Sequence, residues 1–319
     1  MSRPAVSIVL LNWNNYDDTE ECLDSLAEVT YPNVEVILLD NDSPDGSGER
    51  LRDELAELDL PGRYIQNGGN VGFARGCNPG IRDALDRGAD YVLLLNNDSV
   101  VDEGFLEPLI ERAERNPDVG VLTGKTYFYD EPERVHCAGA DLDWVRGRGD
   151  RYGRHQIDEG QFDEPKEIGF APGYFCFVRA AVFDDVGLLS EQYFLGAEEW
   201  DFSARVQRSD WELWYEPESV VWHKIGGSHE ADPKLKYVYN GYRNKLIYMR
   251  KFLPDWKYYP WFVVFWTYAH TVGIWKFTRA FADTNAGPGD ALRTIRAAFV
   301  ANRDSDVVTP EEVIGFSPD

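Results

Sequence analysis

The sequence is poor in cysteine and methionine, and the shortage of cysteine excludes two classes of protein. Only 4 cysteines and 2 methionines occur among 319 residues. The cysteines have neither the spacing of a zinc site nor the density of a small disulfide-linked domain: Cys22, Cys77, Cys137 and Cys176. We therefore expect reduced, buried thiols in a cytosolic protein.

Positive charge is also scarce, and lysine is the rarer basic residue. Lysine and arginine together number 32 against 56 aspartate and glutamate residues, and the formal net charge is -24. A nucleic-acid interface requires a basic face, so the composition argues against a nucleic-acid partner. Acidic residues spread along a lysine-poor chain are typical of a surface adapted to high salt. We therefore expect that the protein works in a cytoplasm of high salt concentration, as in an extreme halophile.

Three further patterns are missing from the sequence. A strand-like run follows Arg3 at once, with no signal-peptide pattern, so we expect a cytoplasmic protein. Only residues 258–275 approach the ~18–20 apolar residues of a membrane span. No internal repeat is evident. With 43% apolar residues the chain can bury one large α/β domain plus an appendage.

Apolar runs alternate with helical patterns over residues 1–100. Strands are expected at 6–11, 34–39, 63–66 and 91–95, and helices at 17–28, 48–58 and 73–87, the last despite Pro79. This alternation predicts a mostly parallel central sheet flanked by helices.

Polar residues follow these strands, where ligands bind in open α/β sheets. The residues concerned are Asn12 and Asn14, then Asp40, Asn41 and Asp42, and finally Asn96, Asn97 and Asp98. A glycine-rich loop at 67–72, which contains Asn70 and Gly72, lacks the lysine of a phosphate-binding P-loop. We expect a single cleft, although each cluster alone is equally consistent with a turn or a helix cap.

Two more groups of residues in the second half of the chain are candidates for chemistry. Glu198, Glu199 and Asp201 open a helix expected over 195–210, where a carboxylate can act as a general base or simply favour the helix dipole. Glu198 and Glu199 point about 100° apart on a helix, so only one faces a cleft directly. His223 follows the apolar pair Val221-Trp222 and is either a ligand for metal or phosphate or a structural residue.

Six segments in order resemble glycosyltransferase family 2, in particular its rhamnosyltransferase-like branch. They are residues 6–14, 38–45, 70–80, 94–98, 187–205 and 223–228, and the resemblance covers about residues 1–230. It implies a GT-A-like nucleotide-diphospho-sugar transferase fold. The implied domains are a catalytic domain over 1–230, with a nucleotide-binding half at 1–100 and an acceptor half at 101–230. A helical, aromatic-rich appendage at 231–301 and a mobile acidic tail at 302–319 are expected to follow.

The resemblance also implies roles for individual residues. Asp98 matches the final acid of the family's D-x-D metal motif, and Asn96 replaces the first. The other matches imply contact with the nucleotide-sugar donor by Asn12, Asn14, Asp40, Asn41, Asp42, Asn70, Gly72, Phe73, Asn78, Asn96 and Asn97. Glu199 matches the catalytic base, with Glu198 and Asp201 as alternatives, and His223 matches a metal or diphosphate contact.

The implied reaction is single displacement with inversion, from a nucleotide-diphosphate sugar to a hydroxyl of a glycan or polyprenyl-linked acceptor. Mg²⁺ or Mn²⁺ would neutralise the leaving diphosphate, and Asp98 is an oxygen ligand suited to either ion. Because Asn96 stands where an acid is usual, a catalytically silent sugar-nucleotide-binding subunit is one alternative. A nucleotidyltransferase is another, although residues 11–15 lack the glycine-rich, basic loop that a triphosphate requires.

The C-terminal part is helical and aromatic in pattern. Residues 258–275 contain no charged side chain, and basic residues flank them. Three interpretations remain open for residues 256–279: an interfacial amphipathic segment in peripheral contact with the cytoplasmic face of a membrane, a buried helix or homo-oligomer contact, and a span.

Overall fold

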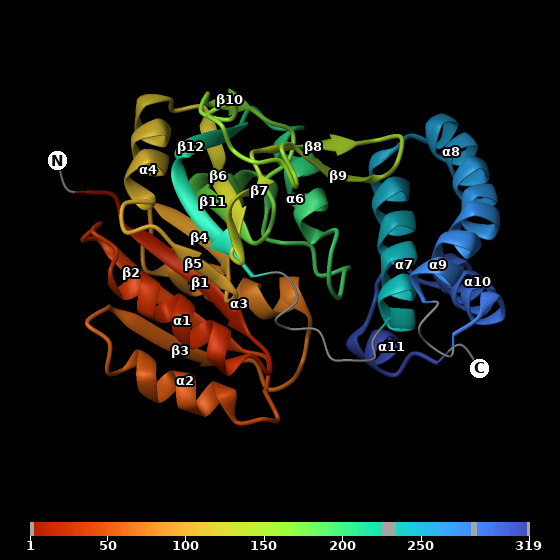
Figure 1. The fold of residues 1–319 in the computed structure, drawn as a ribbon, viewed down its shortest axis with the longest axis horizontal. Helices are drawn as coiled ribbons and strands as arrows, with labels where there is room; N and C mark the ends of the chain where they lie inside the picture. The colour runs from red at the N-terminus through yellow and green to blue at the C-terminus, as the bar shows by residue number, and fades with distance from the viewer. Residues whose placement is uncertain (1–2, 225–233, 282–285, 318–319) are drawn as a thin grey trace. The chain divides into compact units, whose positions relative to one another are not determined.

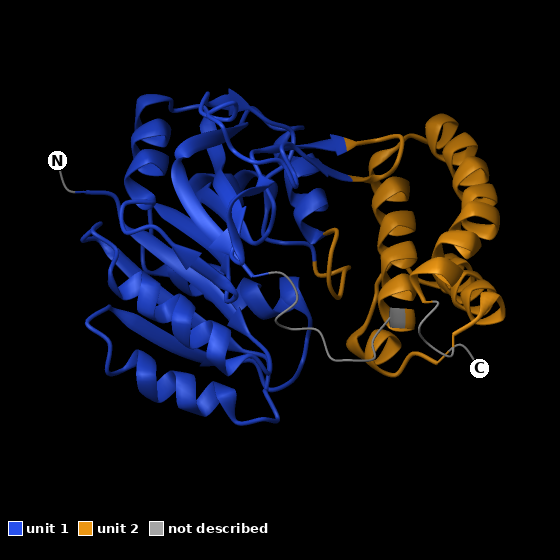
Figure 2. Ribbon diagram, viewed as in Figure 1, with its two compact units in different colours: residues 1–142, 149–190, 198–229 blue, residues 143–148, 191–197, 230–319 orange. Residues whose placement is uncertain are grey.

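Residues 3–224, 234–281 and 286–317 are described by the structure, a computed structural model of the chain (Figure 1). The chain divides into two compact units (Figure 2). Unit 1 comprises residues 1–142, 149–190 and 198–229, and unit 2 comprises 143–148, 191–197 and 230–319.

The first part of unit 1 has the predicted strand and helix order. The elements are β1 (Val6–Asn12), α1 (Tyr16–Ala27), β2 (Val34–Asp40), α2 (Ser47–Leu55), β3 (Gly62–Gln66), α3 (Phe73–Asp86) and β4 (Tyr91–Asn96). Both faces of β1 and β2 are covered, because Ile8 and Leu38 on one face and Val9 and Ile37 on the other are all buried. Continuous apolar runs of this kind are typical of parallel strands covered on both faces. α3 continues through Pro79, as predicted.

The second part of unit 1 extends this sheet. Its strands are β5 (Ser99–Val101), β6 (Val119–Phe128), β7 (Glu131–Cys137), β10 (Lys166–Glu167), β11 (Phe175–Arg179) and β12 (Glu212–His223), and its helices are α4 (Leu106–Arg115), α5 (Ala180–Val186) and α6 (Glu198–Val206). Two further strands, β8 (Ala140–Asp143) and β9 (Arg148–Arg151), form a separate small sheet.

The main sheet has the order β10-β12-β6-β11-β4-β1-β2-β3 within the described residues, with β5 paired to β12 and β7 to β6. β3, β2, β1 and β4 are parallel neighbours, and β11 is antiparallel to both β4 and β6. The prediction of a mostly parallel central sheet with flanking helices is therefore confirmed. The four cysteines are buried and free, as expected.

Unit 2 is helical, as predicted for the appendage. It contains α7 (Lys234–Phe252), α8 (Asp255–Tyr268), the π-helix η1 (Ala269–Gly273), α9 (Ile274–Ala280), α10 (Pro288–Asp304) and α11 (Pro310–Ile314). No helix among the described residues is both long and apolar enough to cross a bilayer.

The prediction of a mobile tail from residue 302 is wrong for the described residues. α10 continues to Asp304, and α11 begins with a capping box in which Thr309 accepts from the backbone of Glu312. The cause is Arg243 of α7, whose side chain is completely buried and requires acceptors. The C-terminal segment supplies them: Arg243 pairs with Glu312 at 2.9 Å and donates to the carbonyls of Ser305 and Val307.

Candidate active site

The carboxyl ends of β1, β2 and β4 meet at one edge of the sheet (Figure 1). Asn12 lies opposite Asp40 in the β1–β2 pair, and Leu11 lies opposite Asn96 in the β1–β4 pair. The predicted convergence of polar strand ends is thus present in the fold.

Asp40 is the centre of a buried hydrogen-bond network at this edge. Its Oδ1 accepts from Asn12 Nδ2 at 2.7 Å and from Ser43 Oγ at 2.6 Å, and its Oδ2 accepts from Gln66 Nε2 at 3.2 Å. Asn12 has no exposed surface. Asn12 therefore orients Asp40.

Asn14 and Asp42 lie in the loops that follow β1 and β2. Both have left-handed backbone conformations, with φ values of 52° and 61°. The backbone N–H of Asn14 donates to Ser43 Oγ at 2.9 Å, which ties the two loops together. The exposed Asp42 side chain accepts from Gln66 Nε2 at 3.3 Å.

Asn41 connects β2 to the predicted glycine-rich loop. Its Nδ2 donates to the carbonyl of Gly72 at 3.2 Å, while Asn70 Oδ1 accepts from the backbone N–H of Gly72 at 3.3 Å. Gly72 has φ +85°, a conformation that favours glycine, and Phe73 starts α3 immediately after it. Asn78 does not join this group, because it is buried and donates to the carbonyl of Leu189 at 3.0 Å.

The turn from Asn96 to Asp98 is held by three neighbouring segments. The backbone N–H of Asn96 donates to the carbonyl of Tyr174 at 3.1 Å, and Asn97 Nδ2 donates to Thr19 Oγ1 at 2.6 Å. The carbonyl of Asp98 accepts from the backbone N–H of Lys224 at 2.8 Å. Asn97 is thus directed toward α1, and the end of β12 is fixed beside Asp98.

Asp98 and His223 form a close pair because β5 and β12 align Ser99 with His223. Asp98 Oδ1 lies 3.0 Å from His223 Nε2, which is also 3.5 Å from Asn96 Nδ2. Asp98 is only 7% exposed, yet neither Asp98 Oδ1 nor His223 Nδ1 has a hydrogen-bond partner in the described part of the chain. Asp98 Oδ1 thus contacts His223 Nε2 without forming a hydrogen bond to it. A buried carboxylate oxygen in this state is costly unless a further group binds it.

The donor types of this pair fit a divalent cation. Two ligand atoms about 2.1 Å from one octahedral ion, at a right angle, lie about 3.0 Å apart. The carboxylate of Asp98 suits Mg²⁺ or Mn²⁺, and the imidazole of His223 is a nitrogen ligand that transition metals accept. No cluster of three His, Cys, Asp or Glu side chains that could hold a metal ion occurs among the residues described. Residues 226–228 of the predicted histidine segment lie outside the described residues.

The three acids of α6 have different surroundings. Burial, and after it the charge of Glu198, raises the pKa of the Cys77 thiol, which places Glu198 toward α3. Burial and then Glu199 raise the pKa of Cys176 to about 12, which places Glu199 near β11. Asp201 is completely buried and pairs with Arg205 at 2.8 Å, as a structural residue would.

Gly173 and Tyr174 connect Glu199 with the Asp98–His223 pair. A Cβ added to Gly173 would lie 3.4 Å from Glu199 Cβ and 3.7 Å from Phe73 Cε1. The next residue, Tyr174, accepts from Asn96 and stacks on His223 with ring centroids 4.6 Å apart. The half-buried Glu199 and the Asp98–His223 pair therefore lie on the same edge of unit 1.

Sequence reasoning missed a stack of rings behind His223. His136 of β7 stacks on His223 with centroids 5.2 Å apart, and Arg151 Nη1 contacts His136 Nε2 at 3.1 Å. Burial, followed by the charge of Arg151, lowers the pKa of His136 to about 2, so its ring is neutral. The aromatic, glycine-rich segment at 167–178 was a signal for Tyr174, but nothing in the sequence pattern separates His136 from an ordinary strand residue.

Asp201→Ala should destabilise unit 1 by about 3 kcal/mol, because breaking a buried ion pair leaves one charge uncompensated. Arg205 is 20% exposed and also donates to backbone carbonyls, so we expect the lower end of the range for buried pairs. Denaturant unfolding measures the change, and the exposed Asp210→Ala is the control, expected within about 0.5 kcal/mol of the wild type. A stable but inactive Asp201→Ala would return Asp201 to the catalytic candidates.

Comparison with known sequences gives a consistent result. The family profile described as "Glycosyl transferase family 2" matches residues 7–187. The glycosyltransferase GlyG of Streptococcus pneumoniae is 30% identical over 128 residues, 40% of this chain and 41% of GlyG. The chain thus spans about two fifths of that relative. The N-acetylglucosaminyl-diphospho-decaprenol L-rhamnosyltransferase of Mycobacterium tuberculosis is 26% identical over 251 residues, 71% of this chain and 78% of that protein.

A solved structure of GalNAc-T7 with UDP, GalNAc and Mn²⁺ is similar in fold to most of the chain. The TM-score is 0.63 at 17% identity, over 84% of this chain and 50% of that chain. At this identity the similarity concerns the fold, and the GT-A-like fold predicted from the sequence is confirmed.

Proposed function

Because the family profile covers more than half of it, the chain belongs to glycosyltransferase family 2, and we propose that it is an inverting, metal-dependent glycosyltransferase. Its donor is a nucleotide-diphosphate sugar, and its acceptor is a hydroxyl of a glycan or lipid-linked glycan. The observation that carries the proposal is the buried Asp98–His223 pair on the same edge as Glu199, in which Asp98 Oδ1 lies 3.0 Å from His223 Nε2.

The residues at the sheet edge have different roles in binding the donor. Asp40 and Asn41 receive the nucleoside, with Asn12 and Gly72 holding them in place. Asp98 and His223 would hold Mg²⁺ or Mn²⁺, and the bound ion would neutralise charge that develops on the leaving diphosphate. Asn96 Nδ2 beside His223 is an additional donor toward a diphosphate oxygen.

Glu199 accepts the proton of the acceptor hydroxyl. The acceptor oxygen forms a bond to the anomeric carbon on the face opposite the diphosphate, and the bond from that carbon to the diphosphate oxygen breaks. The configuration at this carbon is therefore inverted, and no covalent enzyme intermediate is required. Glu199 is half-buried beside the backbone of Gly173, on the edge of the sheet that carries Asp98 and His223.

We extend the proposal to the acceptor and its location. The printed name of the mycobacterial relative specifies a decaprenol diphosphate acceptor, and the aromatic surface of unit 2 supports a similar polyprenyl-linked acceptor here. The chain then acts in the cytoplasm, in peripheral contact with the cytoplasmic face of the membrane. The formal charge of -24 supports operation at high salt.

A thermal-shift screen of nucleotide-sugars with and without Mn²⁺ tests donor binding. A donor at about 100 times its Kd stabilises the folded chain by about 2.7 kcal/mol. We expect a rise in the unfolding midpoint that requires donor and Mn²⁺ together, because Asp98 is the single carboxylate at the pair.

Release of nucleoside diphosphate upon addition of a polyprenyl-linked acceptor tests transfer. Donor binding with no release to any acceptor would favour a silent binding subunit. Pyrophosphate release from a nucleoside triphosphate and a sugar phosphate would instead identify a nucleotidyltransferase.

A further inference from the structure

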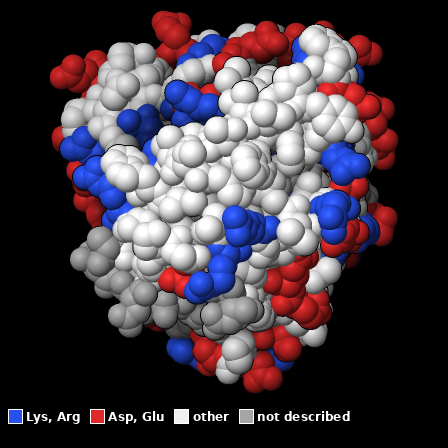
Figure 3. Space-filling model, turned by 90° about the vertical axis from the view of Figure 1, so that its right-hand side faces the viewer, with Lys and Arg blue, Asp and Glu red and all other residues white. Residues whose placement is uncertain are grey.

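Unit 2 carries a concentration of exposed aromatic side chains on α8, η1 and α9. Trp256 is 72% exposed, and further exposed apolar residues on these helices are Tyr259, Val263, Val264, Trp266, Tyr268, Val272 and Trp275. Figure 3 views this side of the molecule, where a broad uncharged area has lysine and arginine at its margins. An apolar surface of this extent marks an interaction site.

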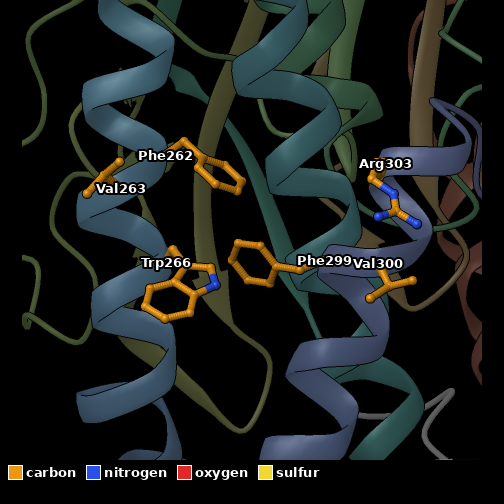
Figure 4. Close-up of a pocket in the computed structure, with 6 residues that line it drawn as sticks. All are labelled: Phe262, Val263, Trp266, Phe299, Val300 and Arg303. Atoms are coloured by element: carbon orange, nitrogen blue, oxygen red, sulfur yellow. The ribbon is translucent and has the colours of Figure 1, made fainter.

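α8 has apolar residues on all its sides, so of the three interpretations left open by the sequence, a strictly amphipathic helix does not describe it. Phe262, Val263 and Trp266 line a hollow of about 310 Å³ together with Phe299, Val300 and Arg303 of α10 (Figure 4). Trp261, Val264, Phe265 and Tyr268 line a second pocket. A helix that is apolar all round is stable only when protein or lipid covers it.

The second pocket, here called the basic pocket, has a volume of about 440 Å³ and lies entirely within unit 2. Its cations are Arg146 and Arg148 from the turn between β8 and β9, Lys245 of α7 and Lys276 of α9. Among the described residues no acidic side chain lines it, although the chain as a whole has 56 acids against 32 bases. The charge of this pocket is therefore opposite to that of the molecule.

The pocket is built by contacts between its walls. Trp261 Nε1 donates to the carbonyl of Val145 at 2.9 Å, which fixes the β8–β9 turn against α8. Lys245 Nζ lies 5.4 Å from the ring centroid of Phe265, and Lys276 Nζ lies 5.7 Å from that of Tyr268. Asp143 is the nearby acid, but both of its oxygens serve the turn: Oδ1 accepts from backbone N–H groups, and Oδ2 lies 3.6 Å from Arg146.

Lys245 is held in an unfavourable environment. Burial, and then the charge of Arg148, lowers its pKa to about 8, against the partly compensating charge of Asp143. An anion in the pocket would offset this cost by restoring a counter-charge. A lysine retained among aromatic rings and another cation is consistent with a ligand-binding role.

We propose that the basic pocket binds the phosphate head group of an anionic membrane lipid while the exposed aromatic residues of α8 and α9 enter the bilayer interface. Tryptophan and tyrosine beside lysine and arginine are the residues that prefer this interface. The inference rests on the membrane contact of the proposed function and specifies the residues and the lipid chemistry.

At high salt, cations in a pocket can still bind an anion, whereas a diffusely charged surface cannot. At molar ionic strength the Debye length is about 3 Å, so diffuse attraction between a surface and a membrane is screened. Partly buried cations in direct contact with a phosphate are screened much less. This property fits a chain whose acidic surface indicates high salt.

Co-sedimentation of the full chain with vesicles tests the proposal. The vesicles are phosphatidylcholine alone, or phosphatidylcholine with phosphatidylglycerol, and the variants are Arg148→Gln/Lys245→Gln and the control Arg250→Gln/Lys251→Gln. The control removes the same charge from exposed positions of α7 outside the pocket. Each basic residue at a membrane surface contributes several-fold in affinity, so we expect the pocket variant to lose about thirtyfold on anionic vesicles and the control less than about threefold.

Several results would overturn the proposal. Equal losses in both variants would indicate general surface charge, and absent binding of wild type to anionic vesicles would exclude the lipid. A pocket that binds inorganic phosphate but not anionic vesicles would identify a soluble ligand. A change in oligomeric state of the pocket variant without vesicle binding would identify a second copy of the chain as the occupant.

Vesicle binding requires no sugar transfer, so its outcome is independent of the proposed catalytic activity. The thermal unfolding midpoint of each variant and its Mn²⁺-dependent donor binding check that both units remain folded. Sugar transfer to a soluble acceptor without vesicle binding would support the proposed enzymatic activity and contradict lipid binding by the pocket. Vesicle binding without any sugar transfer would support the lipid-binding pocket and contradict the proposed enzymatic activity.

Discussion

Asp98→Asn should lower the rate of nucleoside diphosphate release by about a thousandfold, because metal stabilisation of a leaving group is worth several kcal/mol. Asparagine preserves the shape of the side chain and leaves the backbone bond from Lys224 to residue 98 intact, so the turn should persist. The variant removes the one carboxylate beside His223 and therefore the charge that attracts a cation.

Steady-state rates at several Mn²⁺ concentrations measure this effect. Asp102→Asn is the matched control, since Asp102 is exposed just after β5 and its Oδ1 only accepts from the backbone N–H of Gly104. The control should keep wild-type turnover. Full activity of Asp98→Asn at ordinary Mn²⁺ concentrations would show that the cation is held elsewhere or is not needed.

Glu199→Gln should lower kcat by a factor of about 10² to 10⁴, the range for loss of a general base. Glutamine keeps the length and packing of the side chain beside Gly173, so the KM for the donor should change little. Removal of the base should also abolish the acidic limb of the pH–rate profile, which a merely structural role would leave in place.

Glu198→Gln separates the two neighbouring acids. Glu198 is buried toward Cys77, and its side chain points about 100° away from Glu199 on the same helix. We expect Glu198→Gln to retain most of kcat. The opposite result, an inactive Glu198→Gln beside an active Glu199→Gln, would reassign the base and require α6 to turn toward the cleft on substrate binding.

The order of elements over residues 1–100 was predictable because its signal is local. Each strand is a short apolar run and each helix has its own apolar face, so neighbouring residues carry the information. The polar ends of β1, β2 and β4 were predictable for the same reason. Parallel strands bring their carboxyl ends to one edge, and this rule needs no knowledge of individual contacts.

The hydrogen-bond and ion-pair partners of the individual polar side chains were not predictable from this pattern. Asn78 and Asp201 lie in the same family segments as Gly72 and Glu199, respectively, yet Asn78 donates to Leu189 and Asp201 pairs with Arg205. His136 joins the site only because β7 pairs with β6 beside β12. The mobile tail was predicted from its acidic composition, without knowledge that Arg243 requires acceptors from it.

By itself, the sequence determined the α/β class, the strand-end acids and amides, and an uncharged aromatic segment near the C-terminus. The tertiary structure alone decided that Asp98 contacts His223, that Glu199 lies on the same edge of the sheet beside Gly173, and that three further cations surround the basic pocket with Lys245. The reason is physical: local periodicity reports which face of an element is buried. The pairing of residues far apart in the chain depends on strand order, register and the need of every buried polar group for a partner.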